Sequence, residues 1–153
     1  NAHVRLESAM LQHIPQCSRN SICSGIELAL TKNISKASKN AYAPYSDFKV
    51  GAALMTDEGR VYTGVNIENS SFGAGICAER TAFAKAVSEG ERHFSAIAVY
   101  AEKDEAVPCG ICRQFMYEFA PEIIVITGEG DGRLNVRSRE ELLPDGFRLE
   151  GRK

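Results

Sequence analysis

The chain has 153 residues, of which 44% are hydrophobic, and its formal net charge of -2 arises from 18 basic and 20 acidic residues. This length predicts one compact domain, and the mixed charges argue against nucleic acid as a partner, which would need a basic surface. No uninterrupted apolar run is long enough to cross a bilayer, so we expect no membrane-spanning segment.

The five cysteines are an odd number. Three of them, Cys77, Cys109 and Cys112, lie where metal-binding thiolates would be expected. This pattern favours a reducing compartment over a disulfide framework, and we therefore expect a cytoplasmic protein. The composition of residues 1–23 fits a loosely ordered N-terminal extension and equally a remnant of a targeting segment; we expect the extension, followed by one domain over residues 24–153.

Apolar spacing predicts the first elements of that domain. From Ile26 to Ala41 the spacing is helical, and the helix must end before Pro44. Two alternating runs, 50–54 and 61–67, predict a β-hairpin around the turn at residues 57–59. The alanine-rich spacing over residues 78–87 then predicts a tightly packed central helix that Gly90 ends.

The second half predicts further strands and helices. A strand is expected at 96–100, a helix marked by Ile111, Phe115 and Phe119, and another strand at 123–127. The linker at 128–132 is too short for a crossover helix, so the strand at 134–136 should return antiparallel. Ser138 and Glu141 form a capping-box pattern for a short helix that Pro144 ends. Together these elements predict an α/β fold, a three-layer α/β/α sandwich around a mixed five-stranded sheet whose last two strands are antiparallel.

Two short segments carry the chemistry: Cys77-Ala78-Glu79-Arg80 and the run from Pro108 to Gln114. Each lies where a loop becomes a helix, and a cysteine there is favoured as a thiolate by the positive end of the helix dipole. Three protein ligands leave the fourth position of a tetrahedral zinc open, which is typical of catalytic sites, whereas structural sites have four. Cys17 or Cys23 could supply a fourth ligand, but both lie in the polar leader.

Glu79 follows Cys77 by two residues and can reach a water on the metal without coordinating it. It would act first as general base and then as general acid. The alternative is a helix glutamate that is only stabilised by the dipole.

The sequence resembles the homotetrameric cytidine deaminases that act on free nucleosides. The likeness runs from about Ala41 to Phe147. It is carried by Tyr45-Ser46-Asp47-Phe48, Val50-Gly51-Ala52-Ala53-Leu54, Gly64-Val65-Asn66-Ile67-Glu68-Asn69, Cys77-Ala78-Glu79-Arg80-Thr81-Ala82, Pro108-Cys109 to Gln114, and Leu142-Leu143-Pro144.

The resemblance implies a cytidine deaminase domain over 24–153 with Zn²⁺ on Cys77, Cys109 and Cys112. It implies hydrolysis of cytidine and deoxycytidine to uridine and deoxyuridine, with release of ammonia, by a zinc-bound hydroxide and the Glu79 proton shuttle, as in pyrimidine salvage. It also implies a homotetramer with active sites at subunit interfaces. Five substrate contacts are expected on the same grounds, at Phe48, Asn66, Glu68, Ala78 and Phe147.

Three thiolates on one divalent ion leave a net charge of -1, which some cation must offset. By family resemblance Arg80 hydrogen-bonds the ligand sulfurs, and Arg113 is a second candidate that could equally be a solvated helix arginine. Asn66 and Glu68 should project from the same strand face toward ribose hydroxyls, and Glu68 should repel a phosphate. Phe48 could contact the pyrimidine, the core, or both. Phe147 would belong to a neighbouring subunit's site.

Two positions depart from common family versions. Val107 replaces a frequent serine, which should be harmless if the contact is through the backbone carbonyl, and Phe72 replaces a frequent tyrosine, which loses a hydroxyl at a subunit contact. His93 is expected to be an ordinary surface residue.

Three alternatives remain. Nucleic-acid-editing and deoxycytidylate deaminases typically use histidine as the first ligand, where this chain has Cys77. Blasticidin-type deaminases share the three cysteines. A zinc-stabilised binding module without activity would have no physical need for Glu79.

Overall fold

The computed structural model describes residues 30, 33–129 and 134–149. Its named elements are β1 (Val50–Thr56), β2 (Val61–Val65), the short 3-10 helix η1 (Phe72–Ala74), α3 (Ala78–Ser88), β3 (Phe94–Ala101), α4 (Gly110–Phe119), β4 (Ile124–Glu129), β5 (Leu134–Ser138) and α5 (Arg139–Leu142). Residues 33–38 are also helical.

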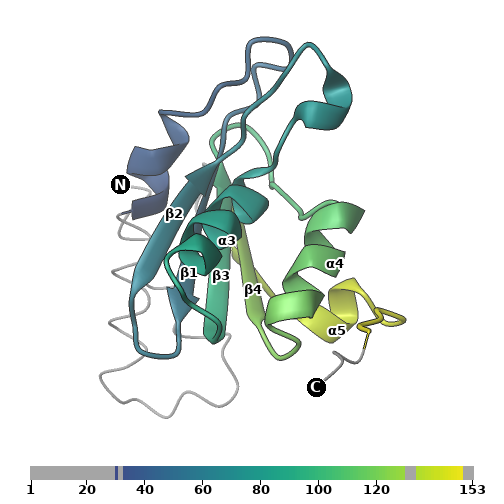
Figure 1. Cartoon of the computed structure of the whole chain (residues 1–153). Helices are drawn as coiled ribbons and strands as arrows, with labels where there is room; N and C mark the ends of the chain where they lie inside the picture. The colour runs from purple at the N-terminus through teal and green to yellow at the C-terminus, as the bar shows by residue number, and fades with distance from the viewer. Residues whose placement is uncertain (1–29, 31–32, 130–133, 150–153) are drawn as a thin grey trace.

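The five strands form one mixed sheet in the order β2-β1-β3-β4-β5 (Figure 1). β1 pairs antiparallel with β2 and β3, β3 pairs parallel with β4, and β5 returns antiparallel beside β4. The predicted mixed sheet and its antiparallel last pair are therefore confirmed. The parallel strands β3 and β4 are connected through the helix α4, as a parallel connection requires.

The hairpin of β1 and β2 turns where the sequence predicts. Gly59 adopts a φ of +83°, a left-handed conformation that glycine reaches without a steric penalty. All seven residues of β1 are buried, although its sequence alternates, because the strand is central and both faces of the sheet are covered.

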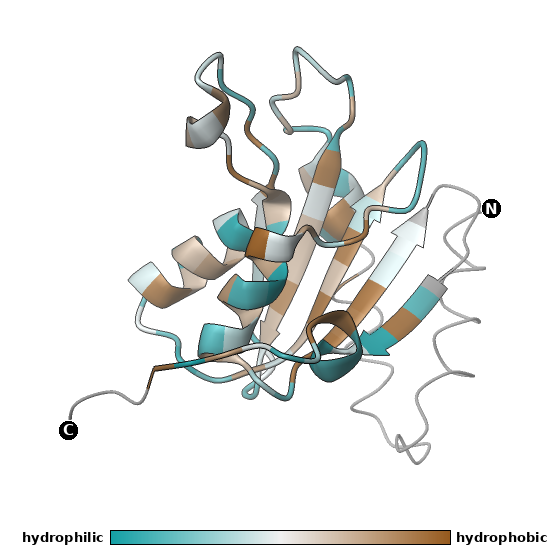
Figure 2. Ribbon diagram, turned by 90° about the vertical axis from the view of Figure 1, so that its right-hand side faces the viewer, coloured by the Kyte–Doolittle hydropathy of each residue, from teal (hydrophilic) through white to brown (hydrophobic). Residues whose placement is uncertain are grey.

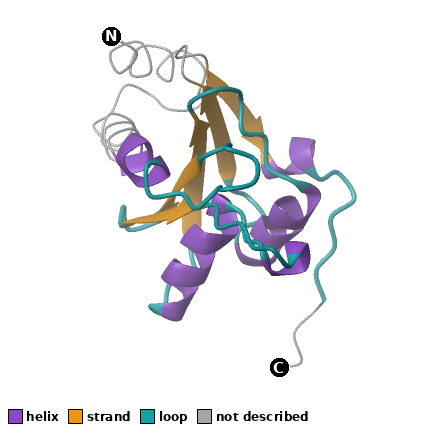
Figure 3. Cartoon of the chain, turned by 90° about the horizontal axis from the view of Figure 1, so that it is seen from above, coloured by secondary structure: helices purple, strands orange, loops and turns teal. Residues whose placement is uncertain are grey.

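Helices lie on both sides of the sheet (Figure 3). On one face α3, α4 and α5 contribute to the larger apolar cluster, in which Phe83 packs edge-on against Phe94. On the other face Leu30 and Ile34 pack against the sheet residues Ala53, Met55 and Ala98. Hydrophobic residues run along the strands, and hydrophilic residues gather in the loops (Figure 2). The sandwich is thus three-layered, as predicted.

A few element boundaries differ from the sequence expectations. β2 ends at Val65, so Asn66 lies just beyond it, and Ile67 continues only as isolated bridges to Tyr42 and Ile76. The capping box is confirmed, since Ser138 accepts from the Glu141 amide and Glu141 accepts from the Ser138 amide. The proposed extension at 1–23 lies outside the described residues. Within the described ranges, none of the helices has the length and apolar character to cross a membrane.

Candidate zinc and substrate site

The starts of α3 and α4 bring three sulfurs together. Cys77 is the N-cap residue of α3, Cys109 is the N-cap residue of α4, and Cys112 lies in the first turn of α4. The three Sγ atoms lie within 4.8 Å of one another, and those of Cys77 and Cys109 are 3.7 Å apart. Two thiolates on a tetrahedral zinc at about 2.3 Å would be about 3.8 Å apart. The spacing therefore fits a zinc ion held by three sulfurs.

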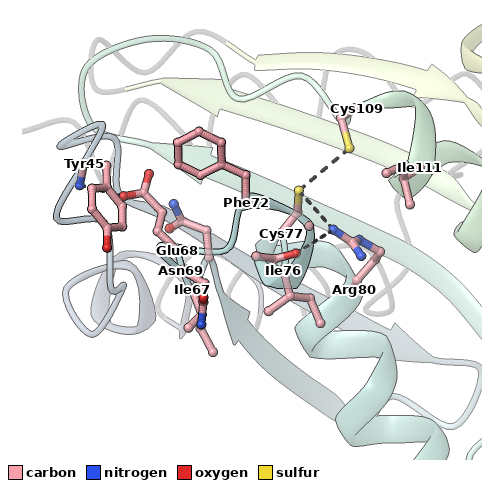
Figure 4. A pocket seen from close by; sticks show the side chains of 13 residues that line it. Tyr45, Ile67, Glu68, Asn69, Phe72, Ile76, Cys77, Arg80, Cys109 and Ile111 are labelled. Carbon is pink, nitrogen blue, oxygen red and sulfur yellow. Dashed lines mark hydrogen bonds between the residues drawn. The ribbon is translucent and has the colours of Figure 1, made fainter.

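Arg80 provides positive charge next to these sulfurs. Its Nη2 atom lies 3.8 Å from Sγ of Cys77 and 3.5 Å from the carbonyl oxygen of Gly75 (Figure 4). Hydrogen bonds from Cys112, Arg80 and Cys109 lower the pKa of Cys77 to about 5. The pKa of Cys112 is raised, because it is hydrogen-bonded to Cys77 and buried beside it. A divalent cation would stabilise all three cysteines as thiolates, so the opposite pKa shifts of Cys77 and Cys112 would no longer arise.

Glu79 is the second residue of α3 and is only 4% exposed. Burial is the main cause that raises the pKa of its carboxyl group, with the nearby Cys77 sulfur adding to the effect. A buried carboxyl whose pKa moves toward neutrality suits a group that must both accept and donate a proton. The geometry thus favours a proton carrier at this position.

Two adjoining cavities open beside the sulfurs. The inner cavity, of about 410 Å³, is lined by residues that include Phe48, Asn66, Glu68, Ala78 and Glu79. The outer cavity, of about 440 Å³, includes Tyr45, Phe72, Arg80 and Ile111 in its lining (Figure 4). Asn66, Glu68, Cys77 and Cys109 line both cavities. Two of the candidate ligands, Glu79 and four of the five predicted substrate contacts therefore line the inner cavity, and the third ligand, Cys112, is buried next to the other two sulfurs.

Asn66 and Glu68 are held by the segment from Tyr45 to Val50, which leads into β1. The Asn66 amide donates to the Phe48 carbonyl and accepts from the Val50 N–H, both at 2.8 Å. Glu68 accepts hydrogen bonds from the N–H and hydroxyl groups of Ser46 and from the Tyr45 N–H at 2.8 Å. These donors lower the pKa of Glu68, so its carboxylate is charged at neutral pH.

Known proteins resemble this chain over most of its length. Residues 25–127 match the family described as the cytidine and deoxycytidylate deaminase zinc-binding region. A probable cytidine deaminase of Dictyostelium discoideum is 49% identical over 72% of this chain and 76% of its own length. A cytidine deaminase of Halalkalibacterium halodurans is 48% identical over 79% of this chain and 93% of its own.

The chain belongs to the cytidine and deoxycytidylate deaminase family. The crystal structure of a cytidine deaminase from Burkholderia pseudomallei is similar to this deaminase with a TM-score of 0.73 and 45% identity, covering 84% of this chain and all of the other. A cytidine deaminase from Mycobacterium tuberculosis has a TM-score of 0.66 and 36% identity, with 78% and 95% of the two chains covered. The deaminase is therefore a zinc-dependent hydrolase with the fold that its sequence predicts.

The donor set of this deaminase fits the zinc of its family. Three sulfurs supply soft ligands and leave one tetrahedral position, as a catalytic site requires. Nε of Arg80 is buried and has no hydrogen-bond partner among the described residues, and Nη2 of the same guanidinium lies 3.8 Å from the Cys77 sulfur, so a positive group lies beside the sulfurs. Zn²⁺ is the cofactor, and Cys77, Cys109 and Cys112 are the residues that would hold it.

Two residues considered for the site line neither cavity of their own chain. Phe147 is 67% exposed and lines neither cavity, although its carbonyl accepts a hydrogen bond from Gln114. Arg113 donates to the carbonyl oxygens of Pro108 and Leu142 at 2.7 and 2.9 Å. It therefore braces the loop before Cys109, and because it donates hydrogen bonds to these two carbonyl oxygens, it is not simply solvated.

The sequence pattern assigned no site role to two polar residues that line the inner cavity, Ser46 and Glu105. Ser46 lies in the family motif Tyr45-Ser46-Asp47-Phe48, and this position could have identified it. Glu105 carries no such signal, because its partners lie 22 and 32 residues away on other strands.

Proposed function

We propose that this deaminase hydrolyses free cytidine and deoxycytidine to uridine and deoxyuridine with release of ammonia, as in pyrimidine salvage. The observation that carries the proposal is the convergence of three cysteine sulfurs within 4.8 Å of one another, beside a cavity that Cys77, Cys109 and the buried Glu79 line. A zinc ion held by these cysteines would supply a Lewis acid that lowers the pKa of water, so that a hydroxide nucleophile is accessible at neutral pH.

Glu79 is proposed to carry the protons. As a carboxylate it takes a proton from the attacking water and delivers it to N3 of the cytosine ring, while oxygen bonds to C4. It then takes the remaining hydroxyl proton and passes it to the C4 amino group, so that the C4–N bond breaks and ammonia leaves. The sum is cytidine plus water giving uridine plus ammonia. Burial supports this role because it raises the pKa of Glu79 toward the working pH.

The chain's other residues are proposed to orient the nucleoside. Ala78 is the first residue of α3, whose N-cap makes no side-chain hydrogen bond, so the backbone N–H there is suited to a pyrimidine oxygen. Asn66 already bonds two backbone groups, but its oxygen and nitrogen each keep one further hydrogen-bonding position for a ribose hydroxyl. Phe48 lines the same cavity and packs against the core, so it supplies an apolar wall.

Charge favours a nucleoside over a nucleotide. The Glu68 carboxylate lines both cavities and is kept ionised by its hydrogen bonds to Ser46 and Tyr45. A phosphate placed near it would be repelled. We therefore propose that deoxycytidylate is a poor substrate.

The assembly is proposed to be a homotetramer whose active sites lie at subunit interfaces. Phe72, Ile111 and Phe147 are apolar side chains that are 87%, 65% and 67% exposed, and the first two border the outer cavity. Such side chains next to a substrate site suit coverage by another subunit. Phe147 would enter a neighbour's site, and Phe72 would make an apolar contact without a hydroxyl. We expect a cytoplasmic location, since thiolate ligands need a reducing compartment.

An ultraviolet assay of cytidine, deoxycytidine, deoxycytidylate and blasticidin tests the proposal. We expect loss of cytidine and deoxycytidine absorbance and little change with the other two. Preferred turnover of blasticidin would establish the rival aminonucleoside activity. An absence of turnover from zinc-loaded protein with all four compounds would favour the binding-module alternative.

A further inference from the structure

The loop between β3 and α4, residues 102–109, forms part of the inner cavity wall. Glu105, Ala106 and Val107 line the cavity, and Cys109 ends the loop. Residues 102–109 contain no helix or strand, so backbone pairing within an element does not fix them. The position of this wall therefore depends on contacts made by individual residues.

Glu105 anchors the middle of the loop to the last two strands of the sheet. Its Oε1 atom accepts hydrogen bonds from the Thr127 hydroxyl on β4 and from Nη1 of Arg137 on β5, the latter at 2.9 Å. Nη1 of Arg137 also lies 3.0 Å from Oγ1 of Thr127. The three side chains thus form a closed cluster.

Burial distinguishes this cluster from an ordinary surface ion pair. Thr127 is 0% exposed, and the side chains of Glu105 and Arg137 are 25% and 31% exposed. Hydrogen bonds from Thr127 and Arg137 lower the pKa of Glu105, so the carboxylate is charged at neutral pH. A charge pair with this little exposure is screened less by solvent than an open one.

The cluster also lies directly beside the cavity. Thr127 is the register partner of Val99 on β3, and Val99 lines the cavity together with Glu105. The strands β4 and β5 can therefore hold the cavity wall in position through the carboxylate of Glu105.

The same loop carries a matched but exposed ion pair. Lys103 lies 2.5 Å from Asp47, and the two side chains are 61% and 80% exposed. Exposed pairs of this kind contribute little to stability. Neither residue lines the described cavities, so this pair is a suitable control.

We propose that Glu105 is a positioning residue for the deaminase reaction, and that through Thr127 and Arg137 it holds the Val107 wall and Cys109 in place. This role rests on the proposed function. It acts through the loop and requires no contact between Glu105 and the reacting atoms.

The test compares Glu105→Gln, Arg137→Met, Arg137→Lys and the control Lys103→Gln in the zinc-loaded enzyme. Glu105→Gln and Arg137→Met should each raise KM for cytidine about fivefold, with a smaller change in kcat, and should speed zinc release to a chelator by a similar factor. The double variant should be no worse than either single one, since both remove one interaction. Arg137→Lys should change KM and zinc release less than Arg137→Met does. Lys103→Gln should keep both quantities within about twofold of the parent.

Parent-like KM and zinc release in Glu105→Gln would overturn the proposal, as would a lower Tm with both quantities unchanged. If Glu105→Gln does not fold, Thr127→Val keeps both charges and should show the same KM and zinc-release effects in weaker form; their absence would also refute the role. Zinc release is measured without substrate. A parent enzyme that fails to deaminate cytidine would therefore refute the proposed function while the zinc arm still tests Glu105.

Discussion

The guanidinium of Arg80 and the sulfur of Cys77 lie 3.8 Å apart, with Cys77 at the N-cap of α3 and Arg80 in its first turn. Three thiolates on a divalent cation leave a net negative charge, and we propose that Arg80 offsets it. Arg80→Gln should therefore lower kcat by about 10–100-fold while zinc content stays near that of the parent. Arg92→Gln is the control, because Arg92 is exposed and bonds only to backbone carbonyls in the described contacts. Equal kcat values for both variants would contradict the role of Arg80.

The variant Glu79→Gln tests whether the Glu79 carboxyl group carries protons or only supports the fold. It should lower kcat by about 10²–10⁴-fold, because the amide cannot transfer protons. Zinc content should be unchanged, and Tm should be equal or higher, because burial disfavours the ionised carboxyl that the variant removes. Steady-state kinetics, metal analysis and thermal unfolding on one preparation measure kcat, zinc content and Tm. Turnover at the parent rate would exclude Glu79 as the proton carrier.

Gly64 controls how closely β2 approaches α3. A Cβ atom at this position would lie 2.3 Å from the carbonyl oxygen of Ala78 and 2.4 Å from the amide of Ala82. Gly64→Ala must push back the helix that carries Glu79, and we expect a loss of about 1–3 kcal/mol in the free energy of unfolding. Denaturant unfolding measures this loss.

The control for this prediction is Gly110→Ala. A Cβ there meets nothing within 4 Å, and residue 110 begins α4, where alanine is a better helix former. Its stability should equal or exceed that of the parent. A Gly64→Ala protein as stable as this control would show that the close approach is not required.

Glu68 should make stability depend on pH in one direction. Its pKa is lowered from 4.5 by hydrogen bonds from Ser46 and Tyr45. A lowered folded pKa contributes stability above the unfolded value of 4.5, and this contribution is lost as pH falls through the folded pKa. The Tm difference between the parent and Glu68→Gln should therefore be constant near neutral pH and shrink below about pH 4.5. A difference that grows on acidification would contradict this assignment.

Local patterns predicted most of the fold. Helical spacing, the turn at Gly59 and the Ser138 capping box each depend on neighbours in sequence, and the structure contains all three. The cysteine cluster was also predictable, because Cys77 and Cys109 precede helices, Cys112 lies in the first turn of α4, and family motifs surround all three.

Long-range contacts explain what the sequence did not reveal. The spacing of Asn66 and Glu68 suggested that both lie on one strand, but β2 ends at Val65, before Asn66. The side-chain amide of Asn66 instead bonds the backbone of Phe48 and Val50, at the start of β1. Arg113 and Glu105 find partners more than 20 residues away, and no local pattern records those pairings.

The most direct measurement determines zinc content and cytidine turnover on the same purified sample. We expect about one zinc per chain, with turnover that falls in step as a chelator removes the metal and returns when zinc is restored. A protein that converts cytidine at full rate after complete zinc removal, or that holds stoichiometric zinc and never converts cytidine, would contradict it.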